Sequence, residues 1–197
     1  FDEQLIELFH TLAKKCNVHQ YKSNKKVFVE DRWRYKDDPN PNSHYKLDYR
    51  LVVYMYKAIV SSEYSWEGHR GLSNSCHDFL RDIATVANNL GFASQSSSRD
   101  YNWTSGRSKE ILLTTGEPLM DVKAFKNGNL HIRINKRVIL AINIQVGKLL
   151  GWIHSAKEAV DELQPDPKDV EFVQEAFQRT HRIELSKPLL RLETAND

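Results

Sequence analysis

A histidine stands among basic residues between positions 123 and 137. The segment contains His131, no acidic residue, and five cations, which are Lys123, Lys126, Arg133, Lys136 and Arg137. Histidine transfers protons near neutral pH, and Lys and Arg stabilise the negative charge that develops on a phosphate when its diester is cleaved. These residue types predict phosphate recognition. Metal-independent nuclease chemistry is the more specific form of this prediction.

The same segment is expected to form a β-hairpin. Runs of alternating apolar and polar residues lie on both sides of residues 127–129, which read Asn-Gly-Asn, and such a connection is typical of a tight hairpin loop. A three-residue loop over 127–129 pairs Ala124 with Ile132. This register collects the apolar side chains of both strands on one face.

The opposite, polar face of this hairpin carries the candidate site. In the expected register Phe125 lies beside His131, and Lys123 lies beside Arg133. Like charges placed directly opposite each other on a sheet cost stability. The cations on this face therefore require an anion or a solvated edge.

Two functional interpretations use this face. In a nuclease, His131 is the general acid and base, Lys123 and Arg133 stabilise the phosphate charge, and Lys126 and Lys136 position the strand. In a non-catalytic module the phosphate backbone of DNA or RNA is only bound. The expected nucleic-acid contacts are Lys126, Asn127, Asn129, Lys136, Arg137 and Phe125, with Tyr101 or Trp103 available for base stacking. In a third interpretation this face has no function: water solvates its cations, and His131 packs against Phe125.

Other chemistries find little support in the sequence. The eight histidines include no His-x-x-x-His pair, and Cys76 and His77 are adjacent, which suits chelation poorly. Phosphate-binding glycine loops of the nucleotide-cofactor type and the nucleophile elbow of serine hydrolases are both missing from the sequence. We expect no metal and no cofactor.

Composition limits the class of protein. The 197 residues are 40% hydrophobic and 10% aromatic, which predicts a compact chain and excludes disorder of its bulk. The formal charge is only +2, so a nucleic-acid site must come from local clustering. No apolar run is long enough for a membrane span. The two cysteines and an acidic N-terminus without a signal-like segment favour the cytoplasm.

Periodicity and capping residues predict the elements around the hairpin. Helices are expected over residues 2–17, 49–59, 73–91, 136–150, 156–163 and 168–180, a short strand over 26–30, and a surface loop over 93–109. Ser73 is the expected N-cap of the third of these helices, and Gly91 its terminating residue. Together these predict a single α+β domain over 1–197, with an N-terminal helical arm (1–45) and a C-terminal helical extension (154–197).

Three segments carry a family resemblance. Residues 125–135, which read FKNGNLHIRIN and precede a helix, together with YRLV at 49–52 and LRDIATV at 80–86, resemble the bacterial and phage family described as domain of unknown function 4942. The resemblance covers Tyr45 to Trp152. It implies a nucleic-acid context in mobile elements, prophages and defence islands, near DNA methyltransferase domains. It implies no reaction for His131, and this chain has no methyltransferase motif.

The sequence thus predicts an α+β fold in which a small antiparallel sheet, centred on the hairpin, packs against several helices. The leading function is a nucleic-acid-acting protein of a mobile-element or phage-defence system, with a toxin-like nuclease as its specific form. The alternatives are a non-catalytic nucleic-acid-binding module and a protein-interaction subunit or inhibitor. The last of these would meet a protein partner from the same operon through exposed Trp33, Trp66 and Trp103.

Overall fold

The structure is a computed structural model, and it describes residues 1–15, 18–24, 44–60, 71–95 and 103–179. Within these residues the helices are α1 (Asp2–Lys15), α2 (Asn74–Asn89), α3 (Lys136–Leu149), α4 (Ala156–Leu163) and α5 (Val170–Gln178), with 3-10 turns η1 (Lys22–Asn24) and η3 (Pro167–Asp169). The strands are β1 (Val18–Gln20), β2 (Tyr45–Leu47), β3 (Arg50–Tyr54), β4 (Ile59–Val60), β5 (Gly71–Leu72), β6 (Ser108–Leu112), β7 (Pro118–Ala124) and β8 (Asn129–Ile134).

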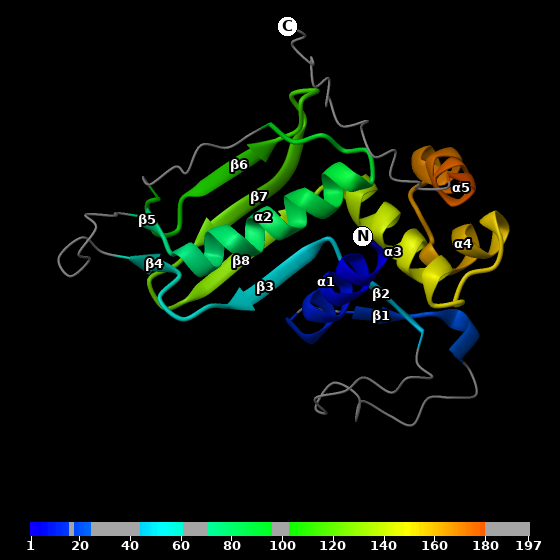
Figure 1. Cartoon of the computed structure of the whole chain (residues 1–197), viewed down its shortest axis with the longest axis horizontal. Helices are drawn as coiled ribbons and strands as arrows, with labels where there is room; N and C mark the ends of the chain where they lie inside the picture. Colours follow the sequence, from blue (N-terminus) through cyan, green and yellow to red (C-terminus); the bar gives the residue numbers. More distant parts are fainter. Residues whose placement is uncertain (16–17, 25–43, 61–70, 96–102, 180–197) are drawn as a thin grey trace, which may run out of the picture.

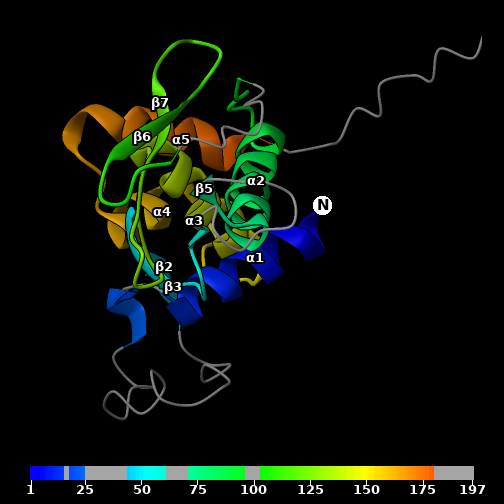
Figure 2. The same cartoon turned by 90° about the vertical axis from the view of Figure 1, so that its left-hand side faces the viewer.

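A four-stranded antiparallel sheet is the centre of the fold. Its strand order is β3-β8-β7-β6, so the predicted hairpin supplies the two central strands. The helices α1 and α2 lie along one face of this sheet (Figure 1), and the view turned by 90° shows both on the same side of the strands (Figure 2). The α+β prediction, with a hairpin-centred sheet packed against helices, is confirmed.

The hairpin register differs from the predicted one. Ala124 pairs with Leu130, not with Ile132, because the three-residue loop comprises residues 126–128. Gly128 has a φ of +91° and donates its N–H to the carbonyl of Phe125 over 3.0 Å. A residue with positive φ is required at the third loop position, and glycine takes it without strain. The loop therefore starts one residue earlier, and the shift of two in pairing keeps the apolar side chains on one face.

The segment 49–59 is not the predicted helix. It forms β3 and the start of β4, and along β3 buried and exposed residues alternate. Leu51 and Val53 are buried, whereas Val52, which the helix would bury, is 56% exposed. Alternation with a period of two and β-branched side chains favour a strand over a helix. The neighbouring edge of β8 also supplies hydrogen-bonding partners that an isolated segment lacks.

Two helix caps agree with the sequence. The Ser73 hydroxyl accepts the N–H of Cys76 at the start of α2, and Gly91, with a φ of +92°, follows the end of this helix. The side chain of Asn135 accepts the N–H of Arg137 at the start of α3. These short-range hydrogen bonds define where each helix begins, which is why local sequence predicts them well.

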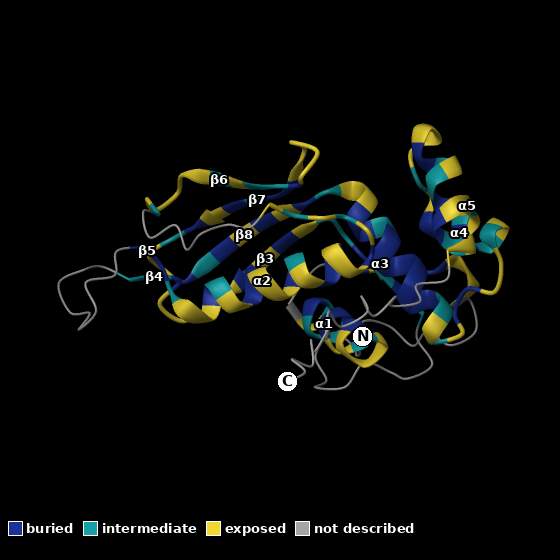
Figure 3. Ribbon diagram, turned by 45° about the horizontal axis from the view of Figure 1, so that its top comes forward, coloured by how far each residue is buried: buried dark blue, intermediate teal, exposed yellow. Residues whose placement is uncertain are grey.

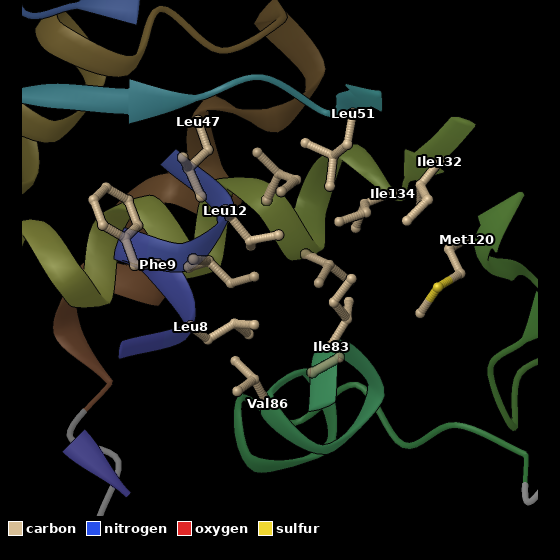
Figure 4. Packing of buried hydrophobic residues seen from close by; sticks show 14 of the residues in the cluster. Leu8, Phe9, Leu12, Leu47, Leu51, Ile83, Val86, Met120, Ile132 and Ile134 are labelled. Atoms are coloured by element: carbon tan, nitrogen blue, oxygen red, sulfur yellow. The ribbon is translucent and has the colours of Figure 1, made fainter. Parts of the chain in front are cut away.

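One cluster of buried side chains connects the helices with the inner face of the sheet. Leu8 and Leu12 of α1 face Ile83 and Val86 of α2 across this cluster, and the Phe9 ring stacks on that of Tyr45 at 5.2 Å. The four-stranded sheet contributes Leu51, Met120, Ile132 and Ile134, and β2 contributes Leu47 (Figure 4). The same cluster includes buried residues of α3, α4 and α5. The N-terminal helix and the C-terminal helices thus share the core of the sheet.

Polar contacts attach α3 and α4 to the first strands. The buried amide of Asn143 accepts the N–H of Leu47 and donates to its carbonyl, over 2.8 and 3.1 Å. The buried carboxylate of Glu162 accepts the N–H groups of Lys22 and Ser23. These bonds join β2 and η1 to the C-terminal half of the described chain.

Several expectations concern residues outside the described ranges. These are the strand over 26–30, the residues Trp33, Trp66 and Tyr101, and the chain beyond 179. Of the predicted loop 93–109, Ser94 forms an isolated bridge with Leu113, and β6 begins at Ser108. Among the described helices, none is long and apolar enough to cross a membrane.

Candidate nucleic-acid interface

One face of the four-stranded sheet points away from α1 and α2, and we call it the open face. Side chains directly opposite in an antiparallel sheet point to the same side, so the pairing defines which residues it carries. They are Arg50, Val52 and Tyr54 of β3; Asn129, His131 and Arg133 of β8; Asp121 and Lys123 of β7; and Ser108 and Glu110 of β6. Along β3 and β8 buried residues alternate with exposed or half-buried ones (Figure 3).

His131 lies in the middle of the open face. Its strand partners are Lys123 on β7 and Val52 on β3, and its ring lies 4.9 Å from that of Phe125, inclined by 54°. The predicted neighbours His131, Lys123 and Phe125 are therefore brought together. The predicted pairing of Lys123 with Arg133 is wrong, because the shifted register places Lys123 opposite His131 and Arg133 two pairs further along, opposite Asp121.

The next row of the open face joins two arginines. Arg133 has Arg50 directly opposite on β3 and Asp121 directly opposite on β7. Asp121 also accepts a hydrogen bond from the Ser108 hydroxyl. Within the described part of the chain, neither arginine forms an ion pair at 4.0 Å or less. The Arg50 guanidinium instead lies 5.0 Å from the ring of Tyr49.

The hairpin turn positions the next candidate contacts. Lys126 is exposed, and its backbone N–H donates to the Ser105 hydroxyl over 3.2 Å. The Asn127 side chain accepts the N–H of Asn129 over 3.1 Å, so this amide oxygen stabilises the turn. Asn129 lies opposite Tyr54. Of these residues Lys126 is the one that presents a free charge beside the open face.

Lys136 and Arg137 lie at the start of α3, beyond the end of β8. The Lys136 ammonium is 2.9 Å from an Asp166 carboxylate oxygen, and the hydrogen bond raises the pKa of Lys136 while it lowers that of Asp166. Arg137 binds the buried carboxylate of Asp169 over 2.9 Å. Both cations are therefore partly neutralised by acidic residues. They flank the arginine row and do not belong to the open face.

Arg50 and Tyr54 are the residues that the sequence interpretation missed. Both lie in the segment 49–59, which was expected to be a helix. They were therefore not considered as residues of a sheet face. The β-branched residues Val52 and Val53 are the local signal for a strand. The types of residues 50–54, which read RLVVY, show no polar–apolar alternation, and the alternation of burial appears only in the structure. Trp103, by contrast, was expected to be an exposed aromatic. Its ring packs against the core, with the ammonium of Lys109 at 5.3 Å.

The described residues contain other polar features away from the open face. A hollow of about 470 Å³ lies between α2, the β6–β7 turn and α5, with Phe92, Glu117 and Phe172 among its lining residues. No group of three or more His, Cys, Asp or Glu side chains in the described ranges is arranged to hold a metal ion. Of the exposed large hydrophobic side chains in the described ranges, Val52 and Tyr54 lie on the open face.

No family model matches the chain, and the searches of curated proteins and of solved structures also found no match. The resemblance to the domain of unknown function 4942 stays a prediction. A function for this protein is therefore derived from the open face.

Proposed function

We propose that the protein binds nucleic acid through the phosphate backbone, on the open face of its sheet. The observation that carries this proposal is the direct pairing of Arg50 with Arg133, with Lys123 on the next strand. Two like charges opposite each other destabilise a sheet, and a phosphate between them would relieve this repulsion. Arginine is suited to the role because its planar guanidinium binds phosphate with two hydrogen bonds.

The local charge supports an anionic ligand although the whole chain is nearly neutral. On and beside the open face stand the cations Arg50, Lys123, Lys126 and Arg133 and the carboxylates Asp121 and Glu110. Asp121 lies beside Arg133, and the Asp48 carboxylate accepts the backbone N–H of Arg50, whose directly opposite residue is the cation Arg133. A positive surface of this kind attracts a polyanion through release of its counterions.

Cleavage of the bound strand is a second candidate function. It is favoured by the pairing of His131 with Lys123, which places a proton-transferring group beside a cation. In this form His131 moves the proton at the reacting oxygen, and Lys123 and Arg133 stabilise the charge on the phosphate. A role in a mobile element or a defence system remains a prediction from the family resemblance.

Binding is tested with labelled DNA and RNA oligonucleotides at several salt concentrations. The double variant Arg50→Gln, Arg133→Gln should bind at least tenfold more weakly at low salt, and the slope of log affinity against log salt should fall by roughly 1.5 to 2. The matched control is Arg81→Gln, Lys157→Gln, which removes the same charge from exposed sites on α2 and α4. The proposal is wrong if the wild type does not bind, if salt has no effect, or if the control loses as much affinity.

Cleavage is tested separately in the presence of a metal chelator. If His131 is the general acid and base, His131→Ala should abolish product formation while oligonucleotide affinity changes by less than threefold. A His131→Ala protein that cleaves at the wild-type rate contradicts this role. A wild type that binds without cleaving identifies a binding module, and a high-salt-stable complex with a protein partner would instead favour the interaction subunit.

A further inference from the structure

Tyr54 presents an aromatic ring at one end of the open face. The side chain is 66% exposed, yet its ring rests against the hairpin turn, because a Cβ atom on Gly128 would lie 2.7 Å from Tyr54 Cε2. Glycine thus allows the ring to lie directly on the turn backbone. One part of the ring is held in place and the rest faces solvent.

Phe125 is a second aromatic ring at the same end. Its backbone N–H donates to the carbonyl of Asn129, the residue that lies opposite Tyr54. A Cβ atom on Gly106 would lie 3.6 Å from the Phe125 ring, so this ring packs against the glycine. The Phe125 ring also lies 4.9 Å from the His131 ring. Tyr54 and Phe125 therefore stand on either side of Asn129, about 10 Å apart if each strand spacing is about 4.8 Å.

Along its strands, the open face carries aromatic side chains at one end and basic side chains at the other. Tyr54 and Arg50 are four residues apart on β3, which corresponds to about 13 Å, with Val52 and His131 in the row between. This length accommodates a few nucleotides. Aromatic rings bind the flat faces of bases, and those faces are available in a single strand but stacked inside a duplex.

We infer that the open face binds single-stranded nucleic acid in preference to duplex. Bases stack on Tyr54 and on the Phe125–His131 pair, while Arg50, Arg133 and Lys123 bind the phosphates of the same strand. The inference rests on the proposed function and adds the class of nucleic acid to it. Charge complementarity alone would accept either form, so the two aromatic platforms are the features that distinguish them.

The first test compares one sequence as a single strand and as a duplex. The single strand should bind at least tenfold more tightly. Tyr54→Ala should weaken single-strand binding by about tenfold, leave duplex binding unchanged, and leave the salt slope unchanged because no phosphate contact is lost. Tyr54→Phe should retain the affinity. Tyr56→Ala is the matched control, since Tyr56 is 72% exposed and lies beyond the end of β3.

A second probe requires no variant. A DNA strand of the same length in which abasic sites replace the nucleotides keeps the phosphates and removes the bases, and it should bind about tenfold more weakly than the intact strand. Equal affinity for intact, abasic and duplex DNA overturns the inference. If the variant Arg50→Gln, Arg133→Gln binds intact, abasic and duplex DNA more weakly than the wild type does, the proposed function stands without the single-strand preference. If the wild type binds none of them, both fail.

Discussion

At the scale of single residues, the opposing arginines and the half-buried His10 show how position determines the role of a charge. Arg50 and Arg133 are both exposed and lie directly opposite each other, where like charges cost stability, and Asp121 lies opposite Arg133 on its other side. His131 lies on the same exposed surface. His10, in contrast, is partly buried on α1, with its Nδ1 3.1 Å from the Tyr45 hydroxyl.

His10 leads to a prediction about pH. Burial, and secondarily the charge of Lys14, lower the pKa of His10 below its ordinary value of 6.5, and burial lowers that of His44 as well. The unfolded chain then takes up a proton more readily than the folded chain. The free energy of unfolding should be at its full value above pH 6.5 and should fall as the pH decreases below that value.

Chemical denaturation between pH 7.5 and 5.5 measures this effect. His10→Gln keeps a polar group near Tyr45 and should reduce the loss of stability on acidification. His131→Gln replaces an exposed histidine that is not among the groups acting on His10 or His44, so it is the control and should lose as much stability as the wild type. An NMR titration that finds the His10 pKa above 6.5 would contradict the prediction.

At the scale of elements, the turn between β7 and β8 determines what the open face presents. The turn requires positive φ at Gly128, and this requirement defines the pairing of every residue along the hairpin. A shift of two residues in the pairing would leave the apolar side chains buried but would give His131 and Arg133 different partners. The turn therefore determines the composition of the site without changing which face is buried.

Gly128→Ala tests this coupling. The new Cβ would lie 2.7 Å from the Tyr54 ring and 2.9 Å from the Met55 carbonyl oxygen, in addition to the cost of positive φ. We expect a loss of about 3 kcal/mol in the free energy of unfolding, measured with urea. Gly116→Ala has a similar φ of +86° with no atom within 4 Å, and should cost about 1 kcal/mol. Equal losses in the two variants would show that the Tyr54 contact is unimportant.

At the scale of the whole molecule, the small net charge conceals two charged regions that meet. Between 158 and 175 the sequence has seven acidic residues and one lysine, whereas 123–137 has five cations and no acid. The structure joins the two through Lys136 with Asp166 and Arg137 with Asp169. The cations on the sheet lie outside this pairing, so the open face keeps a positive charge that the total does not reveal.

Substituting Asp169 and Asp166 separately tests which ion pair holds the acidic region against α3. The Asp169 side chain is 4% exposed and binds Arg137, so Asp169→Asn should lower the free energy of unfolding by about 2 kcal/mol through loss of a charged hydrogen bond. Asp166 is exposed, and its pairing with Lys136 is screened by water. Asp166→Asn should leave the melting temperature unchanged. A larger effect at Asp166 than at Asp169 would be inconsistent with the burial seen in the structure.

The sequence by itself was sufficient for the features that depend on near neighbours. The helix α2 with its Ser73 cap, the start of α3 at Asn135 and the existence of the hairpin follow from hydrogen bonds and periodicities within a few residues. For the same reason the apolar face of the hairpin, and the presence of His131 and Lys123 on its other face, could be predicted.

The other residues of that face could be identified only from the tertiary structure. β3 is a strand because β8 offers it a pairing edge, and this long-range contact overrode the apparent helical pattern of 49–59. Arg50 and Tyr54 belong to the candidate site because of that contact, whereas Trp103 is partly buried against the core. Lys136 and Arg137 found acidic partners some thirty residues away in the chain. Pairings of this kind depend on which segments meet in space, and no local pattern of residues encodes them.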